Sequence, residues 1–218
     1  MRLYLSNPTL SNLLFINNQA SEQGGALYID NASPLLKHLV MVRNQAGQGG
    51  AALLGVGAKP TASELIVAYN SPDNLRLEDT AAPTLTFSVL YNPASYSNHN
   101  LSSPAGTLYT SEPAFLRYTD VTSGASCSPG NHMSCLPVDY HLASGGFSVG
   151  KGTTGGKDVD NSTLDLGIYG GALGDDWNLD YDKVVDWFWP GPISTPPPGY
   201  NVLNYDCNDL SASQQSGC

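Results

Sequence analysis

The chain has 218 residues, with 9 basic and 19 acidic side chains, and its formal net charge is -10. This length suits one ordinary domain or part of a larger repeat protein. Nucleic-acid binding is disfavoured because no basic patch could neutralise phosphates, and no apolar run reaches the roughly 18 residues that a membrane-spanning helix needs. Glycine (23) and proline (15) are abundant and charged helix formers are scarce, which predicts a β-rich, turn-rich fold.

The chain starts without the features of a secretory signal. Met1 and Arg2 are followed by Leu3-Tyr-Leu5 and then by the turn-like Ser6-Asn-Pro8. A signal peptide needs an apolar stretch of about 7–15 residues before its cleavage site. We therefore expect the chain to be the C-terminal part of a longer protein, or a fragment of one.

Four similar segments occupy the first part of the chain. They begin at Pro8, Pro34, Pro60 and Pro83 and end at Asn18, Asn44, Asn70 and Asn92. A fixed period in the twenties is the signature of a solenoid, in which each repeat buries its apolar face against its neighbours. Asparagine tolerates the left-handed turn conformation, and stacked side-chain amides pair along the axis. The four asparagines are therefore expected to form a structural ladder.

Apolar residues alternate within each repeated segment, which predicts strands that turn one face inward. The equivalent positions are Leu13 and Phe15, Leu39 and Met41, Leu65 and Val67, and Phe87 and Val89. Parallel strands would stack these residues about 4.8 Å apart. We expect one interior column to contain Phe15, Met41, Val67 and Val89.

Two solenoid folds fit this pattern. The spacing of Leu10, Leu13, Phe15 and Asn18 also satisfies the skeleton of a leucine-rich repeat, which would place a helix across residues 19–31. In that stretch, however, a glycine pair is followed by an apolar run and a polar turn, a pattern that predicts a second strand. Two or more strands in each coil of about 25 residues describe a parallel β-helix.

The same residues carry a family resemblance. Phe15-Ile-Asn-Asn18 followed by Gly24-Gly-Ala-Leu27 resembles the repeats of right-handed β-helix surface proteins, namely the polymorphic outer membrane proteins and the pectate-lyase-like superfamily. The resemblance implies an all-β, right-handed parallel β-helix of about four coils plus a cap. The expected domains are β-helix coils over 1–95, an irregular last coil and cap over 96–172, and an acidic tail over 173–218. The resemblance implies a fold and leaves the activity open.

Residues 93–137 break the period with prolines and glycines, which predicts an irregular last coil with a long loop. Cys127 and Cys135 bracket a Pro-Gly turn in this loop, a pattern that favours a local disulfide in an oxidising compartment. A zinc site that adds His132 and His141 is an alternative, although its spacing matches no familiar zinc pattern. Free thiols are the third alternative.

Two strings follow the loop, Asp139-Tyr-His-Leu142 and Leu164-Asp-Leu-Gly-Ile-Tyr-Gly-Gly171. They resemble strings that close many secreted bacterial right-handed β-helix proteins, which implies a closing cap. A cap is physically required because an open coil end exposes apolar side chains and unpaired strand edges. His141 alternates with Tyr140 and is expected to be an ordinary strand residue.

Acidic residues concentrate in the tail. Asn178, Asp180, Asp182 and Asp186 place oxygen atoms at positions 1, 3, 5 and 9, the order in which a calcium loop offers its ligands. The string resembles the loops of thrombospondin type 3 and dockerin-like repeats. Lys183 stands where a glycine usually permits the turn, so we expect weak Ca²⁺ binding.

A second acidic string contains Asn204, Asp206, Asn208 and Asp209. It resembles the metal-binding repeats of secreted bacterial proteins, and its hard oxygen ligands favour calcium over transition metals. We expect the neighbouring Cys207 and Cys218 to form a disulfide within this module. The alternative is an acidic tail that is only solvated.

No enzymatic motif is present, and no acids repeat at one register in adjacent coils to make a stacked pair. The expected function is that of the C-terminal part of a secreted or cell-surface bacterial β-helix protein, with a structural or binding role and weak calcium binding. A carbohydrate or another surface protein is the expected partner. The alternative is a carbohydrate-active enzyme, a polysaccharide lyase or hydrolase, whose catalytic coils lie upstream. A third hypothesis is that the chain is the passenger region of a membrane-anchored adhesin.

Overall fold

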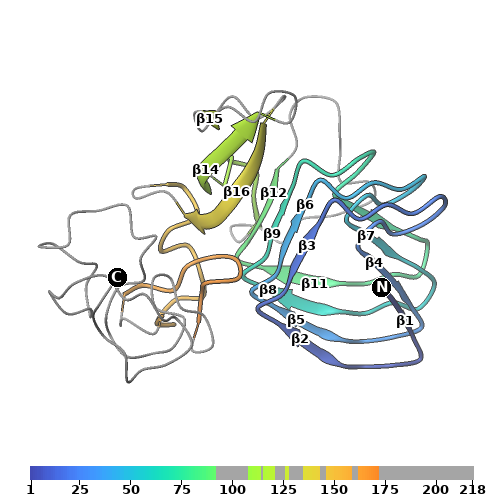
Figure 1. Cartoon of the computed structure of the whole chain (residues 1–218). Helices are drawn as coiled ribbons and strands as arrows, with labels where there is room; N and C mark the ends of the chain where they lie inside the picture. Colours follow the sequence, from blue (N-terminus) through green and yellow to red (C-terminus); the bar gives the residue numbers. More distant parts are fainter. Residues whose placement is uncertain are drawn as a thin grey trace, which may run out of the picture.

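A computed structural model describes residues 1–91, 108–113, 115–120, 126–127, 135–142, 146–158 and 162–171. All elements in these ranges are β-strands, which confirms the all-β prediction. The helix that a leucine-rich repeat would place across residues 19–31 is absent from this described stretch, where residues 27–30 form a strand. The fold is the predicted parallel β-solenoid (Figure 1).

Three parallel sheets form the sides of the solenoid. The first sheet contains β1 (Arg2–Tyr4), β4 (Leu27–Asp30), β7 (Ala52–Leu54) and β10 (Leu75–Leu77). The second sheet contains β2 (Thr9–Ser11), β5 (Leu35–Lys37), β8 (Thr61–Ser63) and β11 (Thr84–Thr86). The third sheet contains β3 (Leu14–Ile16), β6 (Val40–Val42), β9 (Ile66–Ala68), β12 (Ser88–Tyr91) and β13 (Leu108–Tyr109). Successive turns of the chain therefore stack in register.

In the three-residue strands of the second and third sheets the middle residue points inward, whereas in β7 and β10 of the first sheet the two end residues do, because side chains alternate between the two faces of a strand. On the third sheet the register stacks Phe15, Met41, Val67 and Leu90 in one column of the interior core. The predicted fourth member, Val89, is therefore wrong by one position. Val89 pairs with Ile66 and packs on the outer side of the sheet.

The error arises from the shorter fourth coil. The paired strands of the fourth coil lie as many residues after Pro83 as their partners lie after Pro60. Phe87 therefore occupies the corner position of that coil and has a φ of 46°. Ser88 consequently lies opposite Leu65, whose backbone N–H donates to the Ser88 hydroxyl at 3.1 Å. An alignment of the repeats on Asn92, and not on Pro83, therefore assigns each side chain of this strand to the wrong face.

A column of left-handed residues forms the corner between the second and third sheets. Asn12, His38, Glu64 and Phe87 have φ values of 51°, 51°, 57° and 46°. This region of φ costs energy for residues other than glycine, so stacked neighbours must hold each corner in place. The corner limits most of the flanking strands to three residues and turns the chain sharply between sheets.

An asparagine ladder lines the next corner. The Asn44 side-chain oxygen accepts hydrogen bonds from the Asn18 backbone N–H (3.0 Å) and the Asn18 side-chain amide (2.8 Å). The Asn70 side-chain oxygen accepts the same two bonds from Asn44, at 2.8 and 3.0 Å. Asn44 and Asn70 are fully buried, so these bonds satisfy polar groups that water cannot reach. Asn92 lies outside the described residues.

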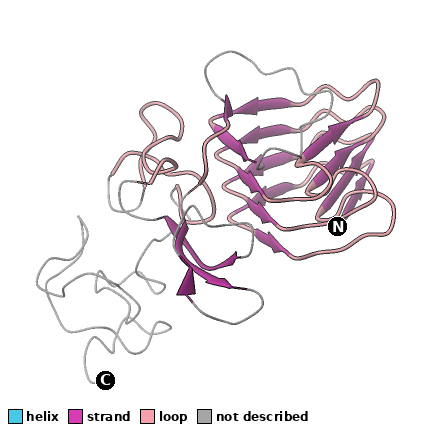
Figure 2. Ribbon diagram, turned by 90° about the horizontal axis from the view of Figure 1, so that it is seen from above, coloured by secondary structure: helices cyan, strands magenta, loops and turns pink. Residues whose placement is uncertain are grey.

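A second core covers the outer face of the third sheet. Its buried members are Val40, Val42, Ile66, Ala68, Val89, Phe115, Tyr140 and Leu166. The strands β14 (Phe115–Asp120), β15 (Ser126–Cys127) and β16 (Cys135–Leu142) form a small antiparallel sheet beside the solenoid (Figure 2). The Phe115 and Tyr140 rings meet edge to face with centroids 5.3 Å apart.

Residues 146–158 and 162–171, here called the clasp, pack against the left-handed corner. The Asn12 side-chain amide donates to the backbone oxygens of Ile168 (2.7 Å) and Gly170 (3.1 Å). The Gly167 N–H donates to the Glu64 backbone oxygen at 2.9 Å. The N–H and hydroxyl of Thr153 both donate to the buried Glu64 carboxylate. The predicted cap string thus docks on the side of the solenoid.

Glycines in the clasp permit this close approach. A Cβ on Gly171 would lie 2.5 Å from His38 Nε2, and one on Gly170 would lie 2.9 Å from His38 Nδ1. Inside the clasp, Asp158 accepts hydrogen bonds from the N–H groups of Asp165 (2.9 Å) and Gly171 (2.7 Å). The Asp-Leu-Gly-x-x-Gly-Gly pattern is therefore a docking motif in which the glycines lie flat against the corner.

Replacing Met41 by alanine should lower the free energy of unfolding by about 2–5 kcal/mol, because its side chain is fully buried in the interior column. Urea unfolding followed by circular dichroism measures the change. Val56→Ala is the control, since Val56 is exposed and its loss should cost less than about 0.5 kcal/mol. Equal costs for the two variants would contradict the buried column.

Clasp docking should weaken in mild acid because of His38. Burial lowers the pKa of His38 below 6.5; the nearby Glu64 carboxylate opposes this shift and Lys37 adds to it. The unfolded chain then binds more protons than the folded chain, so stability is fully present above pH 6.5 and is lost as the pH falls below it. His38→Asn keeps a residue that tolerates the left-handed corner and removes this titration.

The test compares the free energies of unfolding of the native chain and His38→Asn at pH 7.5 and 5.5. The native chain should lose more stability between these values, and a carboxylate contribution common to both proteins cancels in the comparison. Parallel losses in the two proteins would contradict a role for His38.

Candidate binding face

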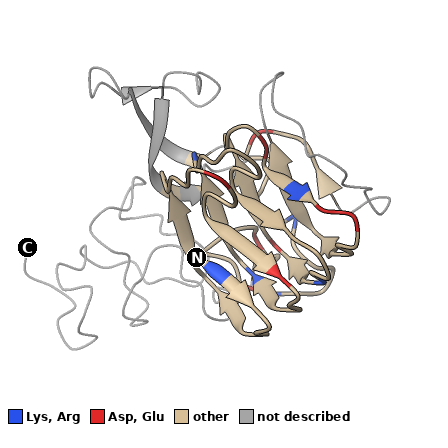
Figure 3. Ribbon diagram, turned by 90° about the vertical axis from the view of Figure 1, so that its right-hand side faces the viewer, with Lys and Arg blue, Asp and Glu red and all other residues tan. Residues whose placement is uncertain are grey.

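The outer face of the first sheet carries exposed aromatic and charged side chains. In the described chain the third sheet is covered by the second core, and the second sheet presents mainly short threonine and serine side chains. The first sheet instead presents the set that we call the Arg–Tyr face, which is seen from outside in Figure 3. Its members are Arg2, Tyr4, Tyr28, Asp30, Arg76 and Glu78.

Strand register arranges these residues in two columns. Arg2 pairs with Tyr28, Tyr28 with Leu53, and Leu53 with Arg76. The second column lies two residues further along each strand. There Tyr4 pairs with Asp30, and continuing the register places Gly55 between Asp30 and Glu78. One column is thus cationic and aromatic, and its neighbour is anionic and aromatic.

Gly55 keeps the centre of the face open for the Tyr28 ring. A Cβ on Gly55 would lie 3.0 Å from Tyr28 Cε2 and 3.4 Å from the Tyr28 hydroxyl oxygen. The ring therefore extends along the sheet toward the next coil. A flat aromatic ring on a flat sheet offers a stacking surface for a planar or ring-shaped ligand.

Arg2 connects the two columns. Its guanidinium carbon lies 5.1 Å from the centre of the Tyr28 ring and 5.5 Å from that of Tyr4. One guanidinium nitrogen lies 3.5 Å from an Asp30 carboxylate oxygen, and the Arg2 side chain is 62% exposed. Such an exposed pair contributes at most about 1 kcal/mol to stability, so Arg2 is available for ligand contacts.

The Tyr28 hydroxyl is held in its protonated form. Partial burial raises the pKa of Tyr28, Asp30 and Glu78 raise it further by their negative charge, and Arg2 opposes them. At neutral pH this phenol therefore both donates and accepts hydrogen bonds. The face combines a stacking ring with neutral, cationic and anionic hydrogen-bonding groups.

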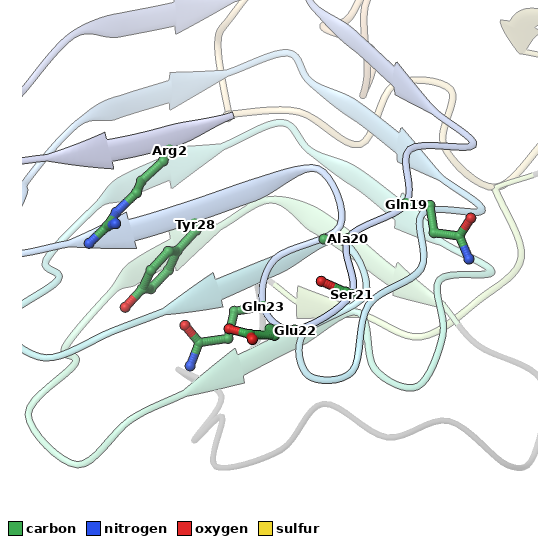
Figure 4. A pocket seen from close by; sticks show the side chains of 7 residues that line it. All are labelled: Arg2, Gln19, Ala20, Ser21, Glu22, Gln23 and Tyr28. Carbon is green, nitrogen blue, oxygen red and sulfur yellow. The ribbon is translucent and has the colours of Figure 1, made fainter.

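A shallow groove of about 470 Å³ adjoins the face (Figure 4). It lies between the first strand and the loop that precedes β4, and Tyr28 and Arg2 border it together with the loop residues. The loop contributes Gln19, Ala20, Ser21, Glu22 and Gln23. Its amide, hydroxyl and carboxylate groups extend the hydrogen-bonding surface of the Arg–Tyr face.

Sequence reasoning did not identify this face. Its signal lay in residues 27–30 and 75–77, where buried residues alternate with partly exposed ones, whereas residues 52–54 between them are all buried. The repeated block of glycines and apolar residues was recognised in two coils only. The third copy, around Arg76, lacks the glycine pair and could be placed only by the strand register.

The predicted calcium ligands lie outside the described residues. This applies to the first string, with Asn178, Asp180, Asp182 and Asp186, and to the second, with Asn204, Asp206, Asn208 and Asp209. Within the described ranges, no three His, Cys, Asp or Glu side chains are grouped so that they could hold a metal ion. The calcium sites therefore stay predictions.

Two of the four cysteines fall in described strands. Cys127 in β15 pairs with Tyr118, and Cys135 in β16 pairs with Asp120, so the two strands flank β14. Their predicted disulfide stays a prediction, as does that between Cys207 and Cys218, which lie outside the described residues. His132 also lies outside them.

Comparison with known proteins gives one match. Residues 12–30 match the Chlamydia polymorphic membrane protein repeat, a stretch that begins just after β2 and runs through β3 and Asn18 to the end of β4. No curated protein and no solved structure matches the chain. Among the described residues no helix is long and apolar enough to cross a membrane. The chain is thus similar, over residues 12–30 with the strands β3 and β4, to a repeat of polymorphic membrane proteins.

Proposed function

We propose that this chain is part of a bacterial β-solenoid protein of the cell surface or extracellular space, and that its role is binding. The observation that carries the proposal is the match of a polymorphic membrane protein repeat to residues 12–30, which contain β3 and β4 of the solenoid. The stacked turns hold the backbone in place, and a preorganised backbone lowers the ordering cost of binding.

The Arg–Tyr face is the proposed binding surface, and a carbohydrate chain is the proposed ligand. Tyr28 supplies a flat ring on which a sugar stacks, and Arg2, Asp30 and Arg76 supply donors and acceptors for its hydroxyl groups. The face is shallow and about four strands long, which suits an extended chain. Another surface protein is the alternative partner.

Surface location is tested on intact cells that produce the native protein. Protease added outside the cells should remove the epitope of an antibody raised against the solenoid, while a cytoplasmic marker protein stays intact. The same treatment after cell lysis is the control for intrinsic cleavage. Protection of the epitope in intact cells, with cleavage after lysis, would contradict the proposed location.

Ligand binding is tested on a glycan array. The native chain should bind a subset of glycans, and Tyr28→Ala should weaken that binding by about tenfold, the equivalent of one lost stacking contact of about 1.4 kcal/mol. Val149→Ala is the control, since Val149 is exposed in the clasp, away from the face. Binding that is unaffected by Tyr28→Ala would exclude the face, and an array without any bound glycan would favour a protein partner.

A second candidate function is glycan cleavage, and one geometric observation favours it. Asp30 and Glu78 lie in the same register column with Gly55 between them, so their backbones are about 10 Å apart, twice the spacing of neighbouring strands. Hydrolysis with inversion uses two carboxyl groups about 6.5–9.5 Å apart. Release of reducing ends from a bound glycan, lost in both Asp30→Asn and Glu78→Gln, would favour this candidate.

We further propose that the acidic tail binds Ca²⁺ weakly, on the basis of the ligand order in its sequence. Titration calorimetry of the whole chain should give a dissociation constant around 10⁻⁴–10⁻³ M, roughly the range of extracellular modules. Asp180→Ala or Asp182→Ala should abolish the heat because each removes a central ligand. Asp79→Ala is the control, since Asp79 is exposed in the coils. No heat at millimolar calcium would contradict the proposal.

A further inference from the structure

On the Arg–Tyr face, Arg76 and Glu78 carry opposite charges two residues apart. Arg76 is the middle residue of β10, and Glu78 follows the strand and continues its pairing, because its N–H donates to the Leu54 oxygen at 2.9 Å. Leu75 and Leu77 are buried in the core, whereas Arg76 and Glu78 are half-buried on the outer side. Two residues of extended chain span about 7 Å. The two charges therefore lie on one surface as neighbours.

These two charges are not used for internal pairing. In the described ranges the one ion pair joins Arg2 to Asp30, with a nitrogen–oxygen distance of 3.5 Å. Arg76 and Glu78 thus form no ion pair with each other or with another described residue. A charged group that is not paired within the protein is available to a ligand group of the opposite charge.

The carboxylates of Asp30 and Glu78 flank a third acceptor. Both belong to the second column of the face, where Gly55 lies between them. A Cβ on Gly55 would lie 3.4 Å from the Tyr28 hydroxyl oxygen, so this hydroxyl reaches from the first column to the gap between the two acids. Burial raises the pKa of Tyr28 most, and the negative charges of Asp30 and Glu78 raise it further, so both act on the hydroxyl. Three oxygen acceptors thus line the second column, and an ammonium group has three donors.

Ligands with charges of only one sign fit this pattern poorly. An acidic chain that lies over Arg76 brings its negative groups within about 7 Å of Glu78, and a chain with only ammonium groups brings positive groups equally close to Arg76. Like charges across an interface lower affinity and suppress binding of the wrong partner. A neutral chain leaves both Arg76 and Glu78 without a partner of opposite charge.

We infer that the ligand of the Arg–Tyr face is a zwitterionic polysaccharide, a chain that carries ammonium and acidic groups on neighbouring sugars. The ammonium group lies over the second column, between Asp30 and Glu78 and beside the Tyr28 hydroxyl. The acidic group lies at Arg76, whose guanidinium donates two parallel hydrogen bonds to it. This inference rests on the proposed function, because it names the class of ligand for the same face.

Two forms of one polymer test the inference. The parent is an alternating chain of glucuronate and N-acetylglucosamine, which carries carboxylates only, and removal of its acetyl groups frees the ammonium groups on the same backbone. In titration calorimetry the whole chain should bind the deacetylated form about fivefold more tightly than the parent, roughly the effect of one surface ion pair.

Three variants assign this preference to the face. Glu78→Gln should weaken binding of the deacetylated form selectively, because it removes one partner of the ammonium group. Tyr28→Phe should do the same, since it keeps the stacking ring and removes the hydroxyl acceptor. Arg76→Gln should weaken binding of both forms by about fivefold, because both carry the carboxylate. Lys59→Gln is the control for loss of one charge, since Lys59 is exposed in a loop outside the face. Thermal melting checks that each variant is folded.

The possible failures of the inference and of the proposed function differ. Equal binding of the two polymer forms by the native chain would overturn the zwitterionic ligand and leave carbohydrate binding intact. A preference that persists in both Glu78→Gln and Tyr28→Phe would overturn it as well, as would binding of neutral glycans alone. If the native chain binds neither polymer form and no glycan on the array, the proposed function fails and the inference fails with it.

Discussion

The left-handed corner between the second and third sheets is the constraint on which the remaining structure depends. Asn12, His38, Glu64 and Phe87 all adopt it, although none of them is glycine. Such a conformation costs energy at an isolated site, and here it is held by the next coil, because the N–H groups of Asn12 and His38 donate to the backbone oxygens of Lys37 and Ser63, at 3.2 Å each. The corners set strand length and direct alternate side chains to the two cores. They also create the surface that the clasp recognises.

Two cores on opposite sides of one sheet follow from this arrangement. The third sheet buries Met41 and Val67 toward the axis, and it buries Val40 and Ile66 toward the second core. Its strands therefore read as continuous apolar runs, as parallel strands covered on both faces do. Among the described residues no second layer packs on the outer face of the first sheet, and its outward positions carry charges and aromatic rings. We accordingly propose this outer face of the first sheet as the binding surface.

The sequence was sufficient to predict the features that repeat. The period, the inward alternation and the asparagines at the strand ends follow from nearest-neighbour stacking, which repeats wherever the residues do. The assignment of Val89 to the core is wrong because one coil is shorter between its strand and its asparagine, a change that inverts the two faces of the strand. When a strand is aligned by its distance to the following asparagine, and that distance is shorter in one coil, every residue of the strand is assigned to the wrong face.

The features that do not repeat could not be derived in this way. The Arg–Tyr face depends on register between coils whose sequences differ, and the clasp brings residues 12 and 168 together across most of the chain. Its glycine motif was recognised as a closing string, but its docking surface was not, because the string itself contains no information about its partner. His38 and Glu64 are polar residues that the alternation pattern does not place in a core, yet both are buried, and both contact the docked clasp.

The clasp also determines how the solenoid comes apart. In a simple solenoid each turn contacts only its neighbours, so terminal turns fray independently and unfolding proceeds in steps. The clasp bonds to Asn12, lies against His38 and bonds to Glu64, which belong to three successive turns. A brace that spans three turns couples their opening, since releasing any one of them requires the brace to release the others. We therefore expect the three braced turns to unfold together and not one by one, and a pulling force along the axis to be shared between the strands and the brace.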